Sequence, residues 1–262
     1  MASTMSHTFT ETEIVLTLRA AGCVFAEDEA ALLVAESASP AELERRVQRR
    51  VTGEPLEVIL GWAEFAGLRI GIDPGVFVPR HRTEYLVRRA ILLAAPHSIV
   101  VDLCCGSGAL GAAMAASIPG IRLYAADIEP AAVACARRNL AGIGEVFRGD
   151  LFEALPAALR GRVELLLVNA PYVPTDEIPG MPPEARDYEP LVTLDGGSDG
   201  LDVHRRVAVG AVEWLAPGGT LLIETSKRQA PLAVEILEKA GLRPSVARSR
   251  KLDATVILGT RP

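Results

Sequence analysis

Residues Val163–Pro174 read VELLLVNAPYVP, an apolar run that ends abruptly in a polar, proline-containing turn. The first six residues of this run are mostly Val and Leu, which is typical of a strand buried on both faces of a parallel sheet. We expect the strand to stop at Asn169, because Pro171 lacks an N–H and biases Ala170 toward an extended conformation. An amide side chain, a backbone carbonyl and the Tyr172 ring are therefore expected to project together from the carboxyl end of a strand.

The tetrad Asn169–Tyr172 allows two interpretations. Open α/β sheets bind ligands in the crevice at the carboxyl ends of their strands, and an Asn carboxamide oxygen and a backbone carbonyl oxygen can together accept both hydrogens of one –NH2 group. A planar –NH2 group held in this way, with a ring against its face, is positioned to react through its nitrogen. Asn and Pro also commonly end strands, so an ordinary strand-to-loop turn explains the same residues.

Apolar runs and helical patterns alternate along the chain from Ser98 onward. The expected strands are SIVVDLC, IRLYAAD, EVFRGD, VELLLVN and GGTLLIET, with closing strands near 244–247 and 254–258. Helices are expected from Gly108, from Pro130, over 201–215 and over 229–240. This alternation predicts an α/β fold with a doubly wound, mostly parallel sheet.

The first part of the chain has a different pattern. Thr10–Glu13 and Ser39–Glu42 each have the sequence of a helix-capping box, and helices are expected across the first fifty residues. We therefore predict a small N-terminal helical domain over 1–52, a hairpin and linker over 53–80, and the main α/β domain over 81–262.

The length and the amino-acid composition are those of an ordinary soluble globular protein. Its 262 residues are 49% hydrophobic and 23% charged, with a net charge of −6. The acidic balance argues mildly against a nucleic-acid partner. No apolar run approaches the length of a membrane span, and the start of the chain lacks the apolar core of a signal peptide, so a cytoplasmic protein without a membrane partner is expected. The four cysteines show no metal-ligand spacing, and no metal site is predicted.

Residues Gly106–Gly111 read GSGALG and lie between an expected strand and an expected helix. Asp127 ends the next strand about twenty residues later, which completes the fingerprint of a dinucleotide-binding loop. Asp102 argues against that interpretation, because a carboxylate at the strand end repels a pyrophosphate on the helix N-terminus and favours a cation. S-adenosylmethionine carries an ammonium and a sulfonium group and no phosphate. It is therefore the expected cofactor.

Polar residues end four successive expected strands: Asp102, Asp127, Asp150 and Asn169. Asp127 is expected to hold the ribose hydroxyls of the cofactor. Asp150 and the apolar Leu151 are expected to supply an acceptor for the adenine amine and a face for the adenine ring. Together these positions are much stronger evidence than the glycine loop alone.

The motifs DLCCGSGAL, ADIEP, GDLF and VNAPY resemble, in this order, those of class I S-adenosylmethionine methyltransferases that act on –NH2 groups. More specifically, the chain resembles the HemK/PrmC family, which methylates the side-chain amide nitrogen of glutamine in release factors. VPRHRTEYLV is similar to the family's IPRPETExLV, and YEPLVTLDGGSDGLDVHRR is similar to its YEPRLALDGGEDGLDFYRR. The resemblance covers about residues 45–262. It implies a Rossmann-like methyltransferase fold, S-adenosyl-L-methionine as cofactor and a release-factor-like protein substrate.

The resemblance also implies roles for individual residues. Those implied to contact the cofactor are Cys104, Cys105, Gly106, Ser107, Gly108, Asp127, Leu151 and Asn169, with Asp150 beside them. Those implied to hold the substrate glutamine are Asn169, Ala170, Pro171 and Tyr172. Two departures stand out, since Ala170 replaces a proline of the family's NPPY and His81-Arg82 replaces its Pro-Glu. A related enzyme with another target therefore stays an alternative.

Further alternatives stay open. A nucleic-acid methyltransferase acting on an exocyclic amine of adenine or guanine also uses an N/D-x-P-Y tetrad, but the chain shows no recognisable base-reading module. A non-catalytic module that binds S-adenosylmethionine is another possibility. The acidic, proline-rich segment 173–202 is interpreted as a solvated loop or as a lid on the substrate side. The lid is favoured because structureless loops of this length are uncommon.

Overall fold

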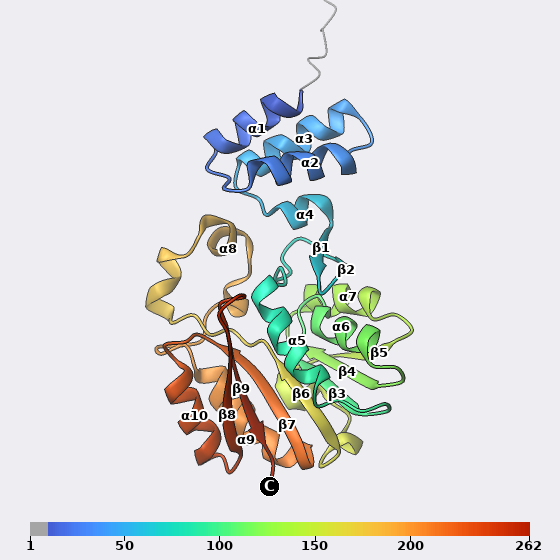
Figure 1. Ribbon diagram of the computed structural model, residues 1–262, viewed down its shortest axis with the longest axis vertical. Coiled ribbons are helices and arrows are strands. Elements are labelled where there is room, and N and C mark those ends of the chain that lie inside the picture. Colours follow the sequence, from blue (N-terminus) through green and yellow to red (C-terminus); the bar gives the residue numbers. More distant parts are fainter. Residues whose placement is uncertain (1–9) are drawn as a thin grey trace, which may run out of the picture.

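A computed structural model describes residues 10–262, and Figure 1 shows a small helical domain joined to a larger α/β domain. The helical domain contains α1 (Glu11–Ala20), α2 (Ala26–Glu36) and α3 (Pro40–Val51). Two of these helices begin where the sequence predicts. The Thr10 hydroxyl accepts a hydrogen bond from the Glu13 N–H, and the Ser39 hydroxyl accepts one from the Glu42 N–H. The predicted N-terminal helical region is therefore present from residue 11 onward, and the first nine residues of the predicted domain lie outside the described residues.

The core of the helical domain extends past residue 52. Ile14 of α1 and Val47 of α3 pack in one buried cluster with Ile59, which lies in the short helix α4 (Leu56–Leu60). By packing, α4 therefore belongs with the helices before it, although the sequence suggests that it is part of the linker.

The main domain is built on a seven-stranded sheet with the strand order β5-β4-β3-β6-β7-β9-β8. The strands are β3 (Ile99–Leu103), β4 (Arg122–Asp127), β5 (Gly144–Arg148), β6 (Val163–Val168), β7 (Leu215–Thr225), β8 (Arg243–Ser249) and β9 (Ala254–Thr260). All neighbours pair in parallel except β9, which is antiparallel to both β7 and β8. This confirms the predicted doubly wound, mostly parallel sheet. The expected hairpin forms a separate antiparallel pair, β1 (Trp62–Phe65) and β2 (Leu68–Gly71).

Helices cover both faces of the large sheet (Figure 1). One layer contains α5 (Glu84–Ile91), α6 (Ala109–Ser117) and α7 (Pro130–Asn139), and the other contains α9 (Asp202–Trp214) and α10 (Ala230–Lys239). In β6, Leu165 and Leu167 pack toward the first layer, whereas Leu166 and Val168 pack toward the second. This explains why the strand is apolar at nearly every position. Within residues 10–262, none of the helices has the length and apolar character needed to cross a membrane.

The acidic segment 173–202 is folded against the helical domain. It contains α8 (Pro183–Tyr188) between two short 3₁₀ turns, Thr175–Gly180 and Leu191–Thr193. Glu184 of α8 forms an ion pair with Arg50 of α3, and the Tyr188 hydroxyl donates a hydrogen bond to the Thr52 carbonyl oxygen at 2.9 Å. These contacts connect the helical domain to the region above the strand ends. The interpretation of this segment as a lid stays a prediction.

Candidate active site

A cavity of about 390 Å3 opens at the carboxyl ends of β3, β4, β5 and β6, where the sequence predicts a ligand site. The strand ends form one wall, and residues from the linker before α5 and from the acidic segment form the other. The predicted site residues on the cavity wall are Cys104, Cys105, Gly106, Ser107, Asp127, Asp150, Leu151, Asn169, Ala170, Pro171 and Tyr172. Two predicted cofactor residues, Asp102 and Gly108, do not line the cavity.

The glycine loop between β3 and α6 forms the first part of the wall. Cys104 (φ 56°), Gly106 (φ 54°) and Gly108 (φ 80°) all have left-handed backbone conformations, which glycine adopts easily and cysteine only at some cost. A Cβ atom on Gly108 would lie 3.0 Å from the Leu140 side chain, so a larger residue there would also crowd Leu140. A Cβ atom on Gly106 would meet nothing within 4 Å. The loop therefore leaves open space beside the cavity at Gly106.

Asp127 holds this loop from the end of β4. Its Oδ2 accepts a hydrogen bond from the Gly106 N–H at 2.8 Å, and its Oδ1 accepts one from the Glu129 N–H at 2.9 Å. Burial raises the pKa of the Asp127 carboxyl group, and these N–H donors oppose the rise. Each carboxylate oxygen keeps a second lone pair. Asp127 can therefore also accept hydrogen bonds from hydroxyl groups of a ligand in the cavity.

Asp150 and Leu151 continue the wall beyond β5. The Asp150 carboxylate pairs with Arg206 of α9, with an Oδ2 to Nη2 distance of 2.6 Å. Leu151 has a φ of 47°. Such strained conformations in residues other than glycine often occur at ligand sites.

Asp102 lies beneath the cavity, inside β3. Its side chain is buried, with Oδ2 accepting a hydrogen bond from the Gly111 N–H of α6 at 2.9 Å. Among residues 10–262, Oδ1 has no hydrogen-bond partner. Burial raises the pKa of the Asp102 carboxyl group to about 8, which favours its protonated form near neutral pH. The expected attraction of a cation by a charged Asp102 therefore does not follow from this geometry. Asp102 instead connects β3 to the start of α6.

The tetrad Asn169–Tyr172 follows β6 and lies on the cavity wall, as predicted. Within residues 10–262, no donor bonds to the Asn169 carboxamide oxygen or the Ala170 carbonyl oxygen. Neither acceptor is therefore used by a donor within the described residues. Ala170 is 2% exposed and belongs to the core cluster that packs under α9 and α10.

Tyr172 is held by two residues that the tetrad pattern does not predict. Its hydroxyl donates a hydrogen bond to Glu224 Oε1 at 3.0 Å, and the Arg82 guanidinium lies 6.0 Å from the centre of its ring. Arg82 Nε also donates to Glu224 Oε1, at 3.2 Å. Burial and the neighbouring Glu224 raise the pKa of the Tyr172 hydroxyl, so it stays protonated and acts as a donor. In the sequence, the only local feature that could have identified Glu224 as a site residue is its position as a single acid near the end of an apolar strand.

The chemistry of the strand-side wall fits S-adenosylmethionine. This wall presents the carboxyl groups of Asp127, Glu129 and Asp150, and its arginine, Arg206, is already paired with Asp150. Carboxylates suit a ligand that carries positive charge and hydroxyl groups, whereas a pyrophosphate would face repulsion. The open space at Gly106 leaves room for part of the ligand.

Comparison with known proteins agrees with this geometry. The family model described as Methyltransferase small domain matches residues 69–178. The crystal structure of a methyltransferase from Pyrococcus furiosus is similar to this chain with a TM-score of 0.57, over 74% of this chain and 89% of that chain. Its sequence identity of 16% shows a shared fold alone.

Two relatives are much more similar in sequence. A release factor glutamine methyltransferase from Geobacter sulfurreducens is 39% identical over 198 residues, which cover 74% of this chain and 69% of the relative. A 4-amino-L-phenylalanine/4-methylamino-L-phenylalanine methyltransferase from Streptomyces pristinaespiralis is 38% identical over 214 residues, which cover 78% of this chain and 72% of the relative. The motifs, the fold and these relatives agree with one another. This chain belongs to the HemK/PrmC family of release factor glutamine methyltransferases.

Proposed function

We propose that this protein transfers a methyl group from S-adenosylmethionine to the side-chain amide nitrogen of a glutamine in a release-factor-like protein. The observation that carries the proposal is that Asn169 and Ala170 line the cavity while no described donor uses the Asn169 carboxamide oxygen or the Ala170 carbonyl oxygen. The relative from Geobacter sulfurreducens is named for this reaction. Release factors act in translation, so the reaction belongs in the cytoplasm and needs neither a membrane nor a nucleic acid as partner.

The cofactor occupies the strand-side wall. When bound, S-adenosylmethionine supplies an electrophilic methyl group. Asp127 accepts hydrogen bonds from the ribose hydroxyls, Asp150 accepts one from the adenine amine, and Leu151 contacts the adenine ring. Further contacts come from Cys104, Cys105, Gly106, Ser107 and Asn169, which line the same wall. Asp102 and Gly108 act from outside the wall by fixing the backbone of the glycine loop.

The tetrad prepares a poor nucleophile for reaction. An amide nitrogen is weakly nucleophilic because its lone pair is delocalised into the carbonyl group. The Asn169 oxygen and the Ala170 carbonyl oxygen accept its two hydrogens, which fixes its direction and favours the shift of electrons toward nitrogen. The nitrogen would release its proton to solvent after positive charge has developed on it, so no strong general base is required. Catalysis then comes mainly from positioning, which can contribute roughly 7–11 kcal/mol, together with preorganised acceptors.

Transfer of labelled methyl to peptides tests this function. The purified protein and labelled S-adenosylmethionine are incubated with a release-factor peptide that contains Gly-Gly-Gln, and mass spectrometry locates the label. We expect label on the glutamine amide nitrogen. A matched peptide with Asn in place of that Gln should be inactive, because its amide is retracted by one C–C bond and misplacement near 1 Å can cost about 10²-fold in rate. Label on neither peptide, with an intact and cofactor-bound protein, would contradict the proposal.

A second candidate function is methylation of an aromatic amine on a free amino acid. The relative from Streptomyces pristinaespiralis is named for such a substrate. In this chain Arg82 lines the same cavity as the tetrad, and a guanidinium can pair with the carboxylate of an amino acid. A paired Glu224 already neutralises part of this charge, so we rank this function second.

The same labelling assay separates the candidates. 4-Aminophenylalanine and an adenine-containing oligonucleotide serve as the competing acceptors, each at the concentration used for the peptide. Exclusive labelling of the amino acid would support the second function, and labelling of the oligonucleotide would support a nucleic-acid methyltransferase. We expect the glutamine peptide to be labelled fastest.

A further inference from the structure

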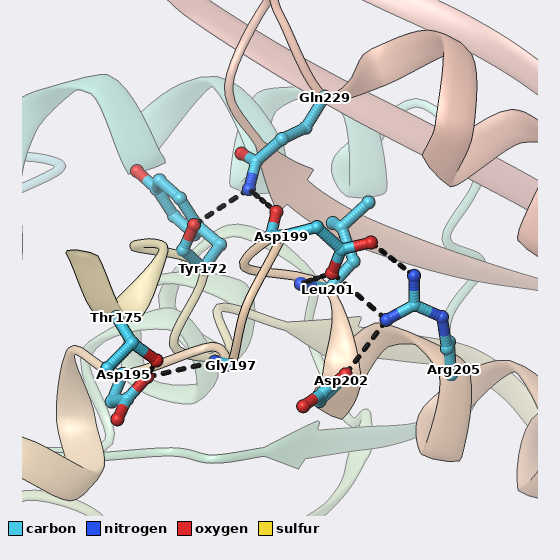
Figure 2. A network of polar contacts seen from close by, with 9 residues as sticks. All are labelled: Tyr172, Thr175, Asp195, Gly197, Asp199, Leu201, Asp202, Arg205 and Gln229. Carbon is cyan, nitrogen blue, oxygen red and sulfur yellow. Dashed lines mark hydrogen bonds and ion pairs between the residues drawn. The ribbon is translucent and has the colours of Figure 1, made fainter. Parts of the chain in front are cut away.

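The block DGGSDG, residues 195–200, has no role in the function proposed above, yet it lies directly against the tetrad. Figure 2 shows that the Gln229 side chain reaches both. Its Nε2 donates one hydrogen bond to the Tyr172 carbonyl oxygen at 2.8 Å and another to the Asp199 carbonyl oxygen at 2.9 Å. One side-chain amide thus joins the last residue of the tetrad to this block.

Gln229 is itself firmly held. It is 7% exposed and lies immediately before α10. Its Oε1 accepts a hydrogen bond from the Ser226 hydroxyl at 2.6 Å, just after the end of β7. The Gln229 amide therefore donates both of its hydrogens to backbone carbonyl groups, and its oxygen accepts a hydrogen bond from a neighbouring side chain. A side-chain amide offers this combination of two donors and an acceptor, whereas a carboxylate of the same shape offers acceptors alone.

The chain that leaves the tetrad is held by the same block and by Leu194, which immediately precedes it. The Val173 N–H donates to the Leu194 carbonyl oxygen and the Thr175 N–H donates to the Gly197 carbonyl oxygen, each at 3.0 Å. The Asp195 carboxylate accepts hydrogen bonds from the Thr175 hydroxyl at 2.7 Å and the Gly197 N–H at 2.9 Å (Figure 2). The direction in which the backbone leaves the tetrad is therefore fixed by residues distant in the sequence.

Glycine is required at position 200 for this close approach. Gly200 has a φ of 77°, and a Cβ atom there would lie 2.3 Å from the Tyr172 carbonyl oxygen and 2.3 Å from Gln229 Nε2. Both distances are far below van der Waals contact, so a larger residue must push these groups apart.

We propose that Gln229 and Gly200 are positioning residues for the methyl acceptor. By fixing the Tyr172 carbonyl group they fix the far end of the tetrad, whose near end is fixed by β6. They thereby determine where the Asn169 carboxamide and the Ala170 carbonyl group point. The inference rests on the proposed transfer to an –NH2 group held by these two acceptors. It predicts that loss of either contact slows methyl transfer and leaves cofactor affinity intact.

Gln229→Glu tests the role of the amide, because the two side chains have nearly the same volume. The Glu carboxylate would face the two carbonyl oxygens without a hydrogen to donate. We expect the single-turnover rate with the glutamine peptide, at saturating cofactor, to fall by at least about tenfold. Affinity for S-adenosylmethionine should stay within about twofold by calorimetry. Gln48→Glu makes the same change at an exposed position of α3 and should alter neither quantity. A rate equal to that of the wild type, or a matching loss of cofactor affinity, overturns the inference.

Gly200→Ala tests the close approach, with Gly218→Ala as the matched control. The two glycines have nearly the same φ, 77° and 78°, but a Cβ atom on Gly218 would meet nothing within 4 Å. Both variants therefore carry the same backbone strain, and only Gly200→Ala displaces the tetrad. We expect the transfer rate to fall by at least about tenfold in Gly200→Ala relative to Gly218→Ala. Equal rates overturn the role of Gly200. Gln229→Glu still tests the inference if Gly200→Ala does not fold.

Hydrogen exchange separates this inference from the proposed function. If the wild type methylates no glutamine peptide, the proposed function fails, and the positioning role is then measured on the backbone. The Val173 and Thr175 amides should exchange faster in Gln229→Glu than in the wild type, because the tetrad has lost its anchor. Unchanged exchange at both amides overturns the inference whatever the activity.

Discussion

The two sides of the cavity are held together in different ways. On the cofactor side, Asp127 bonds the N–H groups of Gly106 and Glu129, which belong to loops at the ends of adjacent strands. On the acceptor side, the Tyr172 hydroxyl and carbonyl groups bond Glu224 and Gln229, which lie 52 and 57 residues further along the chain. The glycine loop of the cofactor side is thus held through backbone N–H groups at the strand ends, although Asp150 on the same side pairs with Arg206 of α9. The acceptor side depends on side chains that reach the tetrad from other elements.

This difference predicts how the two sides respond to substitution. A change on the cofactor side should alter the affinity for the cofactor with little effect on the rate of the bound complex. A change on the acceptor side should alter the rate with little effect on cofactor affinity, because the acceptor nitrogen must be aimed within a fraction of an ångström. The substitutions below test this division.

Asn169→Ala should have the largest effect. It removes the carboxamide oxygen that accepts one hydrogen of the reacting –NH2 group, so the transfer rate should fall by at least about 10²-fold, or about 2.7 kcal/mol. Single-turnover rates with the glutamine peptide at saturating cofactor measure this loss. Cofactor affinity should change by less than about fivefold, since other residues supply most of the expected cofactor contacts. A rate close to that of the wild type would show that the carboxamide does not hold the acceptor.

Asp127→Ala changes the cofactor side of the cavity, so it should alter cofactor affinity and not the transfer rate. It removes the expected acceptor for the ribose hydroxyls together with the bonds that hold Gly106 and Glu129. Calorimetry should show a loss of about 1–3 kcal/mol in affinity for S-adenosylmethionine. The transfer rate at saturating cofactor should stay within about threefold. Asp28→Ala, which removes an exposed acid from α2, is the control and should leave affinity unchanged. Unchanged affinity in Asp127→Ala would mean that the wild-type Asp127 carboxylate only holds the glycine loop and does not contact the cofactor.

The same difference explains how much the sequence predicts. The strands, the glycine loop and the tetrad Asn169–Tyr172 follow from local patterns, because apolar runs, glycine turns and X-Pro steps act within a few residues. Glu224 and Gln229 could not be assigned a role in this way. Their contacts depend on β6 and β7 lying side by side, and no local pattern specifies which side chains then meet.

Asp102 shows a second limit of the sequence. Its position near the end of a strand is predictable, but successive side chains of a strand point to opposite faces, and the register decides what each one meets. In the fold Asp102 points toward α6 and bonds Gly111. The sequence argument for the cofactor relied on a charged Asp102. In the fold this carboxyl group is buried, and burial raises its pKa to about 8.

Asp102→Asn tests this burial through the pH dependence of stability. Burial raises the pKa of Asp102 to about 8 from an ordinary value of 3.8. Between these values the folded state binds a proton that the unfolded state has lost, so the wild type should lose stability as the pH rises from 5 to 8. The uncharged Asn lacks this dependence. The wild type should therefore weaken relative to Asp102→Asn by about 1–2 kcal/mol between about pH 6.5 and 8 in denaturant unfolding. A constant difference would show that the folded protein holds Asp102 ionised.

Ala170→Pro should have the smallest effect, because the proposed mechanism uses the carbonyl group of this residue and not its side chain. Proline restores the family's NPPY tetrad and keeps the carbonyl, while Pro171 already biases position 170 toward an extended backbone. The variant should fold, and its single-turnover rate should stay within about tenfold of the wild type, or about 1.4 kcal/mol. Asn169→Ala is the direct comparison, because the two positions are neighbours in one tetrad. The transfer rate of Ala170→Pro should exceed that of Asn169→Ala by at least about tenfold. Inactivation of Ala170→Pro with unchanged cofactor affinity would mean that the alanine makes room for a bulkier acceptor. The aromatic amine would then replace the glutamine amide as the proposed substrate.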